Sequence, residues 1–339
     1  MKIIDPTFEI LDEYFREERI LEQIERAGRI CYKSEDKIHE NSAGPFIKRI
    51  IQRGHESVLE MGQFVFECHL DSDTIMYKFL EKNPRFNQID KLEKRHFLVS
   101  GNPRSFRDLT RICPEQKVVK ALLTALTDEF PVLYEDLRPK HGWISPDGVR
   151  VRRLSPAEID ALSLDLFIRH RTLLVKLVIN RAVTHELVRH RPASYLQESQ
   201  RYCRYGEARF GGEVYLIRPC FYHEGTEEFR IWKRAMEESE KTYLRLLKTS
   251  SPQAARTVLP NSCKTEIMVN ATLSEWAHIL RLRTSQAADP SMREIMLKLL
   301  AELTARFPEV FGPIREALQE AVACRDPGTC EHQSGPVGK

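Results

Sequence analysis

Residues 189–202 read Arg-His-Arg-Pro-Ala-Ser-Tyr-Leu-Gln-Glu-Ser-Gln-Arg-Tyr, and they follow an apolar run, Leu173–Val188, that leads into the protein interior. Two guanidinium groups flank an imidazole here, and a third guanidinium follows among hydroxyl, amide and carboxylate groups. This set of side chains is suited to binding a polyanion. The alternative is a solvated basic helix end, where arginine and histidine lie beside the last carbonyl groups of a helix.

The composition favours a small anionic ligand. The chain has 339 residues and a net charge of only +3, from 52 basic and 49 acidic residues. Any basic site must therefore be a local cluster of residues, and the overall charge does not indicate binding to nucleic acid or to an anionic membrane. No apolar run approaches the roughly 20 residues of a membrane helix, and the first residues lack a secretory pattern. We expect a cytoplasmic protein whose eight scattered cysteines are reduced.

Hydrophobic periodicity predicts the local elements. Residues 64–70 alternate as a strand with Phe64, Phe66, Cys68 and Leu70 on one side, and residues 163–188 predict a strand and a helix, or one buried helix. A short strand is expected at 211–216. Helices are expected at 8–28 (ending near Gly28), 45–53 (ending at Gly54), 117–137, 226–249, 253–259, 274–282 and from Pro290 after the capping residue Asp289. The tail past Pro313 is expected to be polar and frayed.

Three further stretches carry recognisable chemistry. Residues 54–60 read Gly-His-Glu-Ser-Val-Leu-Glu, in which Ser57 and Glu60 have the spacing of a helix capping box. Residues 254–260 read Ala-Ala-Arg-Thr-Val-Leu-Pro, and 280–283 read Leu-Arg-Leu-Arg.

These stretches, in this order, resemble the signatures of the flavin-dependent thymidylate synthases (the ThyX family). The resemblance includes residues 24–34 and covers most of the chain outside 85–160. It implies an α+β fold, a mixed sheet with flanking helices. We expect a single domain over 1–320, with 85–160 as an elaboration and 321–339 as a polar tail. The family resemblance also implies a homotetramer whose sites are shared between subunits.

The resemblance implies reductive methylation of dUMP to dTMP. Methylenetetrahydrofolate would supply the one-carbon unit, and NADPH would reduce a bound FAD that carries the hydride. Such chemistry leaves orientation and electrostatics to the protein. No metal, nucleic acid or membrane is expected as a partner.

Site residues follow position by position from the same resemblance. Arg283 is the expected catalytic residue, since a fixed positive charge against the uracil ring would activate C5. Ser199 is expected to bind rather than to act as a nucleophile, because no base is assigned beside it. Residues expected to contact FAD are His55, Ser57, Arg189, His190, Arg191, Gln197, Thr272, Ser274 and His278, and Asn270 belongs to the same segment, where this chain is out of register by about two residues. Residues expected to contact dUMP are Glu186, Arg189, Gln197, Glu198, Ser199, Gln200, Arg201, Arg256 and Arg283.

Three other interpretations remain open. Cys220, with His223 nearby, could form an activated thiolate. Cys324, Cys330 and His332 could ligate a metal, although their spacing fits no common zinc pattern. The basic and aromatic residues between 189 and 209 could instead bind single-stranded nucleic acid through backbone contacts and base stacking.

Overall fold

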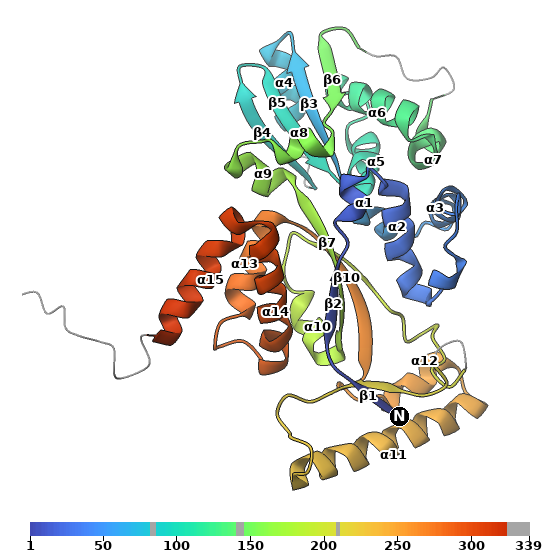
Figure 1. Cartoon of the computed structure of the whole chain (residues 1–339). Coiled ribbons are helices and arrows are strands. Elements are labelled where there is room, and N and C mark those ends of the chain that lie inside the picture. Colours follow the sequence, from blue (N-terminus) through green and yellow to red (C-terminus); the bar gives the residue numbers. More distant parts are fainter. Residues whose placement is uncertain (82–85, 140–145, 208–210, 324–339) are drawn as a thin grey trace, which may run out of the picture. The chain divides into compact units, whose positions relative to one another are not determined.

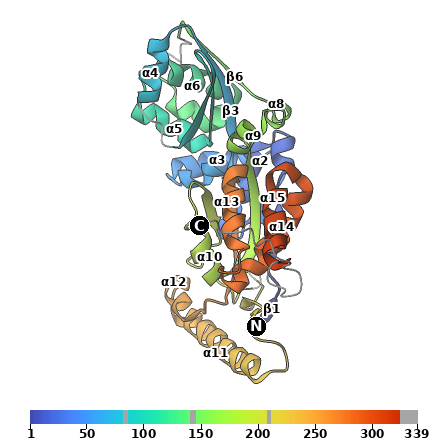
Figure 2. The same ribbon diagram turned by 90° about the vertical axis from the view of Figure 1, so that its left-hand side faces the viewer.

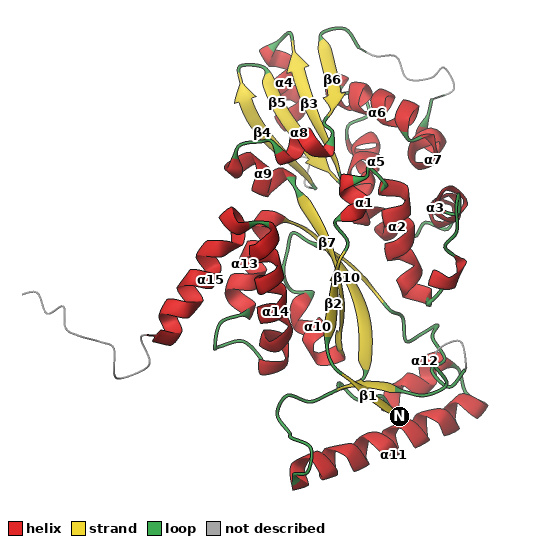
Figure 3. Cartoon of the chain, in the orientation of Figure 1, coloured by secondary structure: helices red, strands yellow, loops and turns green. Residues whose placement is uncertain are grey.

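The computed structural model describes residues 1–81, 86–139, 146–207 and 211–323. Within it the chain divides into two compact units, Met1–Leu273 and a second unit that begins at Ser274. Helices and antiparallel sheets together confirm the α+β class (Figures 1 and 3). The single domain over 1–320 stays a prediction. Residues 324–339, with Cys324, Cys330 and His332, lie outside the described residues.

A four-stranded antiparallel sheet forms the centre of the first unit. Its order is β2 (Thr7–Ile10), β7 (Thr172–Asn180), β10 (Lys264–Thr272) and β8 (Ser194–Gln197). The apolar side chains of β7, such as Val175 and Leu177, are fully buried. Residues 163–188 thus form α9 (Leu164–His170), β7 and α10 (Arg181–Leu187), which confirms the strand-and-helix alternative.

A second antiparallel sheet has the order β4 (Asn87–Glu93), β5 (His96–Gly101), β3 (Phe64–Leu70) and β6 (Val149–Arg153). Phe64, Phe66, Cys68 and Leu70 share one core, as the alternation predicts, because successive side chains of a strand point to opposite faces. Helices α4 (Asp73–Glu81), α5 (Pro103–Ile112) and α6 (Lys117–Glu129) cover that face, and α8 (Pro156–Asp160) and α9 cover the other (Figure 2). The expected helix over 117–137 ends at Glu129, and α7 (Pro131–Tyr134) follows.

A smaller layer is built on the parallel pair β1 (Lys2–Ile4) and β9 (Tyr215–Ile217). The helix expected at 226–249 is confirmed as α11 (Glu227–Thr249), and the hydroxyl of Thr226 caps it by accepting from the backbone N–H of Phe229 at 3.3 Å. Next come α12 (Pro252–Ala255) and a 3₁₀ turn, Arg256–Val258.

The N-terminal segment differs from its prediction. The expected helix over 8–28 is wrong at its start, because residues 7–10 instead pair with the edge of β7 as β2. The chain then forms α1 (Glu13–Arg16) and α2 (Ile20–Arg29). Gly28 lies inside α2, where a Cβ would be 2.5 Å from Cγ1 of Val58. Gly54 does end α3 (Ala43–Gln52), with the positive φ of 69° that glycine adopts easily.

The second unit contains α13 (Leu273–Arg283), α14 (Pro290–Arg306) and α15 (Pro308–Ala323). Asp289 caps α14 as predicted, since its carboxylate accepts from the backbone N–H groups of Ser291 and Met292 at 2.9 and 3.3 Å. The expected fraying past Pro313 is wrong for residues 314–323, because α15 continues to Ala323 and buries Phe311 and Ile314; the rest of that tail lies outside the described residues. None of the described helices is long and apolar enough to cross a bilayer.

Candidate active site

Residues 189–202, the signature stretch, are held against the central sheet by β8. This short strand pairs antiparallel with β10, which places Gln197 opposite Ile267. The side-chain amide of Gln197 donates to the hydroxyls of Thr184 and Thr265, each at 3.1 Å. Gln197 thereby ties β8 to both α10 and β10, and the loop that follows it starts from a rigid support.

The Arg-His-Arg turn lies between α10 and β8. Its two arginines, Arg189 and Arg191, are exposed, whereas His190 between them is buried. The hydroxyl of Tyr195 lies 2.9 Å from the carbonyl oxygen of His190 and 3.0 Å from that of Leu187, and so braces the turn. The turn therefore presents two guanidinium groups to solvent on a braced backbone.

Residues 198–201 alternate between the interior and the surface. Glu198 and Gln200 are buried, Ser199 is half-buried and Arg201 is exposed. The backbone N–H of Ser199 donates to Cys31 at 3.1 Å, and its carbonyl accepts from Cys203 at 3.0 Å. Of residues 198–201, only Ser199 and Arg201 offer accessible side chains, and Gln197, which precedes them in the predicted nucleotide-binding run, is half-buried as well.

Glu198 enters a buried network of charges. Its carboxylate accepts from Nζ of Lys264 at 2.8 Å, and Lys264 also donates to Glu266 at 2.6 Å. Lys33 donates to Glu266 as well, and Lys176 lies 2.7 Å from its other oxygen. One carboxylate oxygen of Glu198, Oε1, is buried without a hydrogen-bond partner among the described residues.

Lys264 and Glu266, at the centre of this network, both stay ionised. Burial alone would lower the pKa of Lys264, but attraction to Glu198 and Glu266 raises it above its ordinary value. Burial would likewise raise the pKa of Glu266, but its lysine neighbours, Lys264 first, hold it well below the ordinary range. The loop after β8 is thus anchored by a paired, desolvated set of charges.

Tyr32 contacts both residues 54–60, which we call the second motif, and the loop that follows β8, residues 198–202, which we call the signature loop. The ring of Tyr32 lies 5.2 Å from the ring of Tyr202, and its hydroxyl lies 3.4 Å from Nδ1 of His55. His55 and Ser57 are both exposed. Residues 199–202 and 55–57, far apart in sequence, therefore line one accessible region of the first unit.

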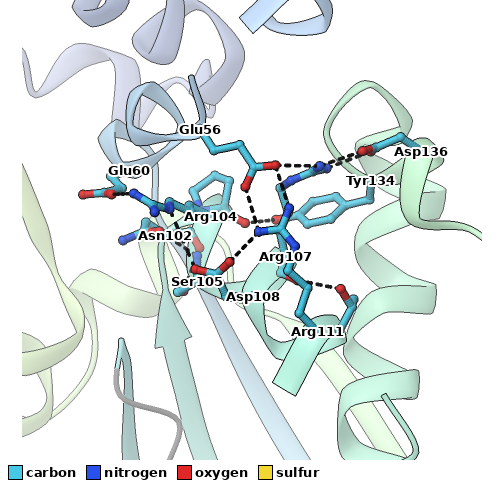
Figure 4. Close-up of polar contacts among 12 residues, drawn as sticks. Glu56, Glu60, Asn102, Arg104, Ser105, Arg107, Asp108, Arg111, Tyr134 and Asp136 are labelled. Atoms are coloured by element: carbon cyan, nitrogen blue, oxygen red, sulfur yellow. Dashed lines mark hydrogen bonds and ion pairs between the residues drawn. The ribbon is translucent and has the colours of Figure 1, made fainter. Parts of the chain in front are cut away.

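The glutamates of the second motif are held by arginines of α5 (Figure 4). Glu56 accepts from Arg107 at 3.1 Å and from Arg111 at 2.8 Å, and Glu60 accepts from Arg104 at 2.6 Å. Burial would raise the pKa of Glu56, but its hydrogen bonds and attraction to Arg111 and Arg107 lower it. The capping box that the spacing of Ser57 and Glu60 allows does not form, because residues 56–61 are a 3₁₀ helix without a side-chain cap.

Arg107 is the central residue of this cluster. It is 1% exposed, and it also donates to both carboxylate oxygens of Asp136, at 2.8 and 2.6 Å. The sequence contains one signal for the cluster. Arginines at 104, 107 and 111 repeat every three or four residues, which places them on one face of a helix.

The remaining predicted residues of the first unit lie on α10, β10 and the turn after α12. Glu186 and Arg256 are half-buried, and Thr272 ends β10 opposite Thr172. The side-chain amide of Asn270 donates to the carbonyl of Glu60 at 3.0 Å, which ties β10 to the second motif. The amide oxygen of Asn270 is buried without a hydrogen-bond partner in the described part of the chain.

Ser274, His278 and Arg283 belong to α13 in the second unit. Ser274 and His278 are one helical turn apart and so lie on one face of the helix. His278 is exposed and Arg283 is half-buried near the end of the helix. The geometry of these three residues is described within the second unit alone.

Comparison with known proteins assigns a family. The family model described as thymidylate synthase complementing protein matches residues 15–81 and 167–309, and leaves 82–166 unmatched between them. A flavin-dependent thymidylate synthase of Corynebacterium glutamicum is 33% identical over 150 residues, 40% of this chain and 58% of that protein. One of Pyrococcus abyssi is 35% identical over 161 residues, 47% of this chain and 64% of that protein. The chain thus spans about three fifths of these relatives' length.

Proposed function

The chain belongs to the thymidylate synthase complementing protein family, and on this premise we propose that it is a flavin-dependent thymidylate synthase that converts dUMP to dTMP. FAD would be the bound flavin, methylenetetrahydrofolate the one-carbon donor and NADPH the reductant. The bound flavin would supply the hydride that completes the new methyl group. The printed names of the curated relatives support this proposal.

The observation that carries the proposal is the meeting of two matched stretches at Tyr32. Tyr202 lies 5.2 Å away on one side, and His55 lies 3.4 Å from the hydroxyl on the other. Aromatic rings and an imidazole suit a planar heterocycle, and the neighbouring Arg201 suits a phosphate. One accessible region thereby offers both kinds of group that a nucleotide requires.

In this proposal dUMP is held by the loop after β8. Arg201 grips the phosphate as a planar fork, and Ser199 donates to an oxygen. The side chains of Glu198 and Gln200 point inward, so these residues contribute through the backbone that they hold in place. Gln197, Glu186, Arg189 and Arg256 complete the nucleotide contacts.

FAD is proposed to lie along His55, Ser57 and the Arg-His-Arg turn. The donor set fits this group, because Arg189 and Arg191 are both exposed and suit a diphosphate. The amide oxygen of Asn270, which has no hydrogen-bond partner among the described residues, can accept from a polar ring. Buried His190 would brace the turn. The remaining proposed flavin contacts are Gln197, Thr272, Ser274 and His278.

Arg283 is the proposed catalytic residue. Its guanidinium would stabilise negative charge on N3 and the conjugated oxygens of the uracil ring, which makes C5 a better nucleophile. Arginine suits this role because it remains charged at any physiological pH.

The assembly and setting follow from the same family resemblance. We propose a homotetramer with shared sites, acting in the cytoplasm on small-molecule substrates without nucleic acid or membrane partners. Cys31, Cys68, Cys203 and Cys263 are free thiols, as suits a reducing compartment.

The test is a spectrum followed by a product assay. Purified protein should show flavin absorption that bleaches with anaerobic NADPH and responds to dUMP, and the complete mixture should yield dTMP by mass spectrometry. A Cys220→Ser variant should retain activity, which would dismiss a thiolate mechanism. A colourless protein that takes up no FAD and makes no dTMP would overturn the proposal.

A further inference from the structure

Two histidines and a glutamate converge on the polar side of the second sheet, and none of the three is among the proposed flavin or nucleotide contacts. Glu67 and His69 are two residues apart on β3, so they share a face, and His96 on β5 pairs directly with His69. The two imidazole rings are stacked, with centroids 3.9 Å apart and planes 17° from parallel. All three side chains retain solvent access.

The nitrogen atoms of both rings are directed at the same carboxylate oxygen. Oε1 of Glu67 lies 2.8 Å from Nε2 of His96 and 3.7 Å from Nε2 of His69, and the three candidate ligand atoms all lie within 4.8 Å of one another. Zinc bonds of about 2.0–2.2 Å in a tetrahedron separate neighbouring ligands by about 3.4 Å. The distances from Oε1 of Glu67 to the two ring nitrogens, 2.8 and 3.7 Å, lie on either side of that value.

We propose that Glu67, His69 and His96 form a binding site for a divalent transition metal ion, with zinc the best match to two imidazoles and one carboxylate. These three residues form no recognisable ligand spacing in the sequence, because they become neighbours only when β3 and β5 pair. Three protein ligands leave the fourth position of a tetrahedron to water. The ion would link the two middle strands of the sheet.

The surroundings of the cluster are compatible with a cation. Arg152 donates to Oε2 of Glu67 at 2.6 Å, which leaves Oε1 directed at the imidazoles and fixes the carboxylate, as outer-shell partners of metal ligands do. Arg152 also donates to Glu158, which offsets its charge. Arg150 is exposed beside His69 in the same open pocket, and no ion pair offsets its charge among the described contacts. It should weaken metal binding without preventing it.

Zinc titration of the full chain by calorimetry tests the site. A Cys324→Ser/Cys330→Ser background removes the thiols of the C-terminal tail, which could bind zinc independently. One zinc ion per chain is expected in this background, with affinity reduced about tenfold or more by His69→Ala or His96→Ala. The matched control is His223→Ala, an exposed histidine outside the cluster, which should leave the affinity unchanged.

Arg150→Ala separates a cation site from an anion site. Removing this like charge should tighten zinc binding, and inorganic phosphate should give no heat that depends on Arg150. The proposal would be overturned if His69→Ala and His96→Ala both bound zinc as tightly as the background protein does. No binding at about 1 mM zinc would also overturn it. So would phosphate binding that Arg150→Ala abolishes while zinc binding is absent. Circular dichroism checks that the variants fold.

Discussion

Arg107 of α5 donates to Glu56 over 3.1 Å, which joins a segment that the family model leaves unmatched to a motif inside a matched stretch. The guanidinium is buried, and Asp136 holds its other side. Residues 55–57 therefore depend on α5 for their position. The segment between the matched stretches has a structural connection to the proposed flavin-binding region.

Arg107→Ala should destabilise the protein by about 1.5–3 kcal/mol, because it removes charge-assisted hydrogen bonds to Glu56 and Asp136, while Glu56 keeps Arg111 as a partner. Urea unfolding followed by circular dichroism measures the loss. Arg111→Ala removes an exposed arginine from the same carboxylate and should cost no more than about 1 kcal/mol. Equal losses in the two variants would contradict the central place given to Arg107.

Acid should weaken the buried charge network. In the folded chain the pKa of Glu266 lies below its ordinary value of 4.5, because its lysine partners outweigh burial. The unfolded chain therefore binds the proton more tightly. The stabilisation by Glu266 is complete above about pH 4.5 and is lost as the pH falls toward the folded pKa.

The free energy of unfolding, measured in urea between about pH 3 and pH 7, checks this dependence. Glu266→Gln removes the titrating group, so the variant should be less stable at neutral pH and should lose less stability on acidification. Parallel pH profiles in the wild type and the variant would refute the assignment. Glu302→Gln, which changes an exposed ion pair, is the control.

Arg201→Ala should weaken dUMP binding about tenfold to a hundredfold, since a hydrogen bond to a charged group contributes about 1.5–3 kcal/mol. Because Arg201 is exposed, the unfolding free energy should hardly change. Calorimetry with dUMP measures the affinity, and Arg230→Ala, at an exposed position on α11, is the matched control. An unchanged affinity would remove Arg201 from the proposed phosphate site.

Arg283→Ala should reduce kcat about a hundredfold or more, as loss of a charge that stabilises a transition state does. FAD content and the melting temperature should stay close to wild type. Steady-state dTMP formation gives kcat and KM. If kcat is retained and only KM rises, Arg283 binds the nucleotide without activating it.

Local patterns were sufficient for several elements and failed where distant contacts decided. The strand at 64–70, the helix at 226–249 and the cap at Asp289 depend on neighbouring residues, and all three are confirmed. Residues 8–10 are expected to begin a helix, yet they belong to a strand, because the edge of β7 requires backbone partners.

For the candidate site too, the sequence identified residues, and only the structure showed their orientations and contacts. The sequence located the residues of the signature loop but not their directions, since pairing of β8 with β10 turns Glu198 inward and leaves Arg201 outside. Ser57 and Glu60 have the spacing of a capping box, but α5 supplies Glu60 with an arginine instead. Glu60 and its partner Arg104 are 44 residues apart in sequence, so no local pattern could predict their contact.

By itself, the sequence determined the α+β class, most of the helices and strands, and the family to which the chain belongs, because periodicity, caps and motifs are written in consecutive residues. Only the tertiary structure decided that Tyr32 joins His55 to Tyr202, that Lys264 sits between Glu198 and Glu266, and that His69 stacks on His96. These contacts arise when sheets form and bury their faces. Their geometry depends on strand register and burial, which no short stretch of sequence specifies.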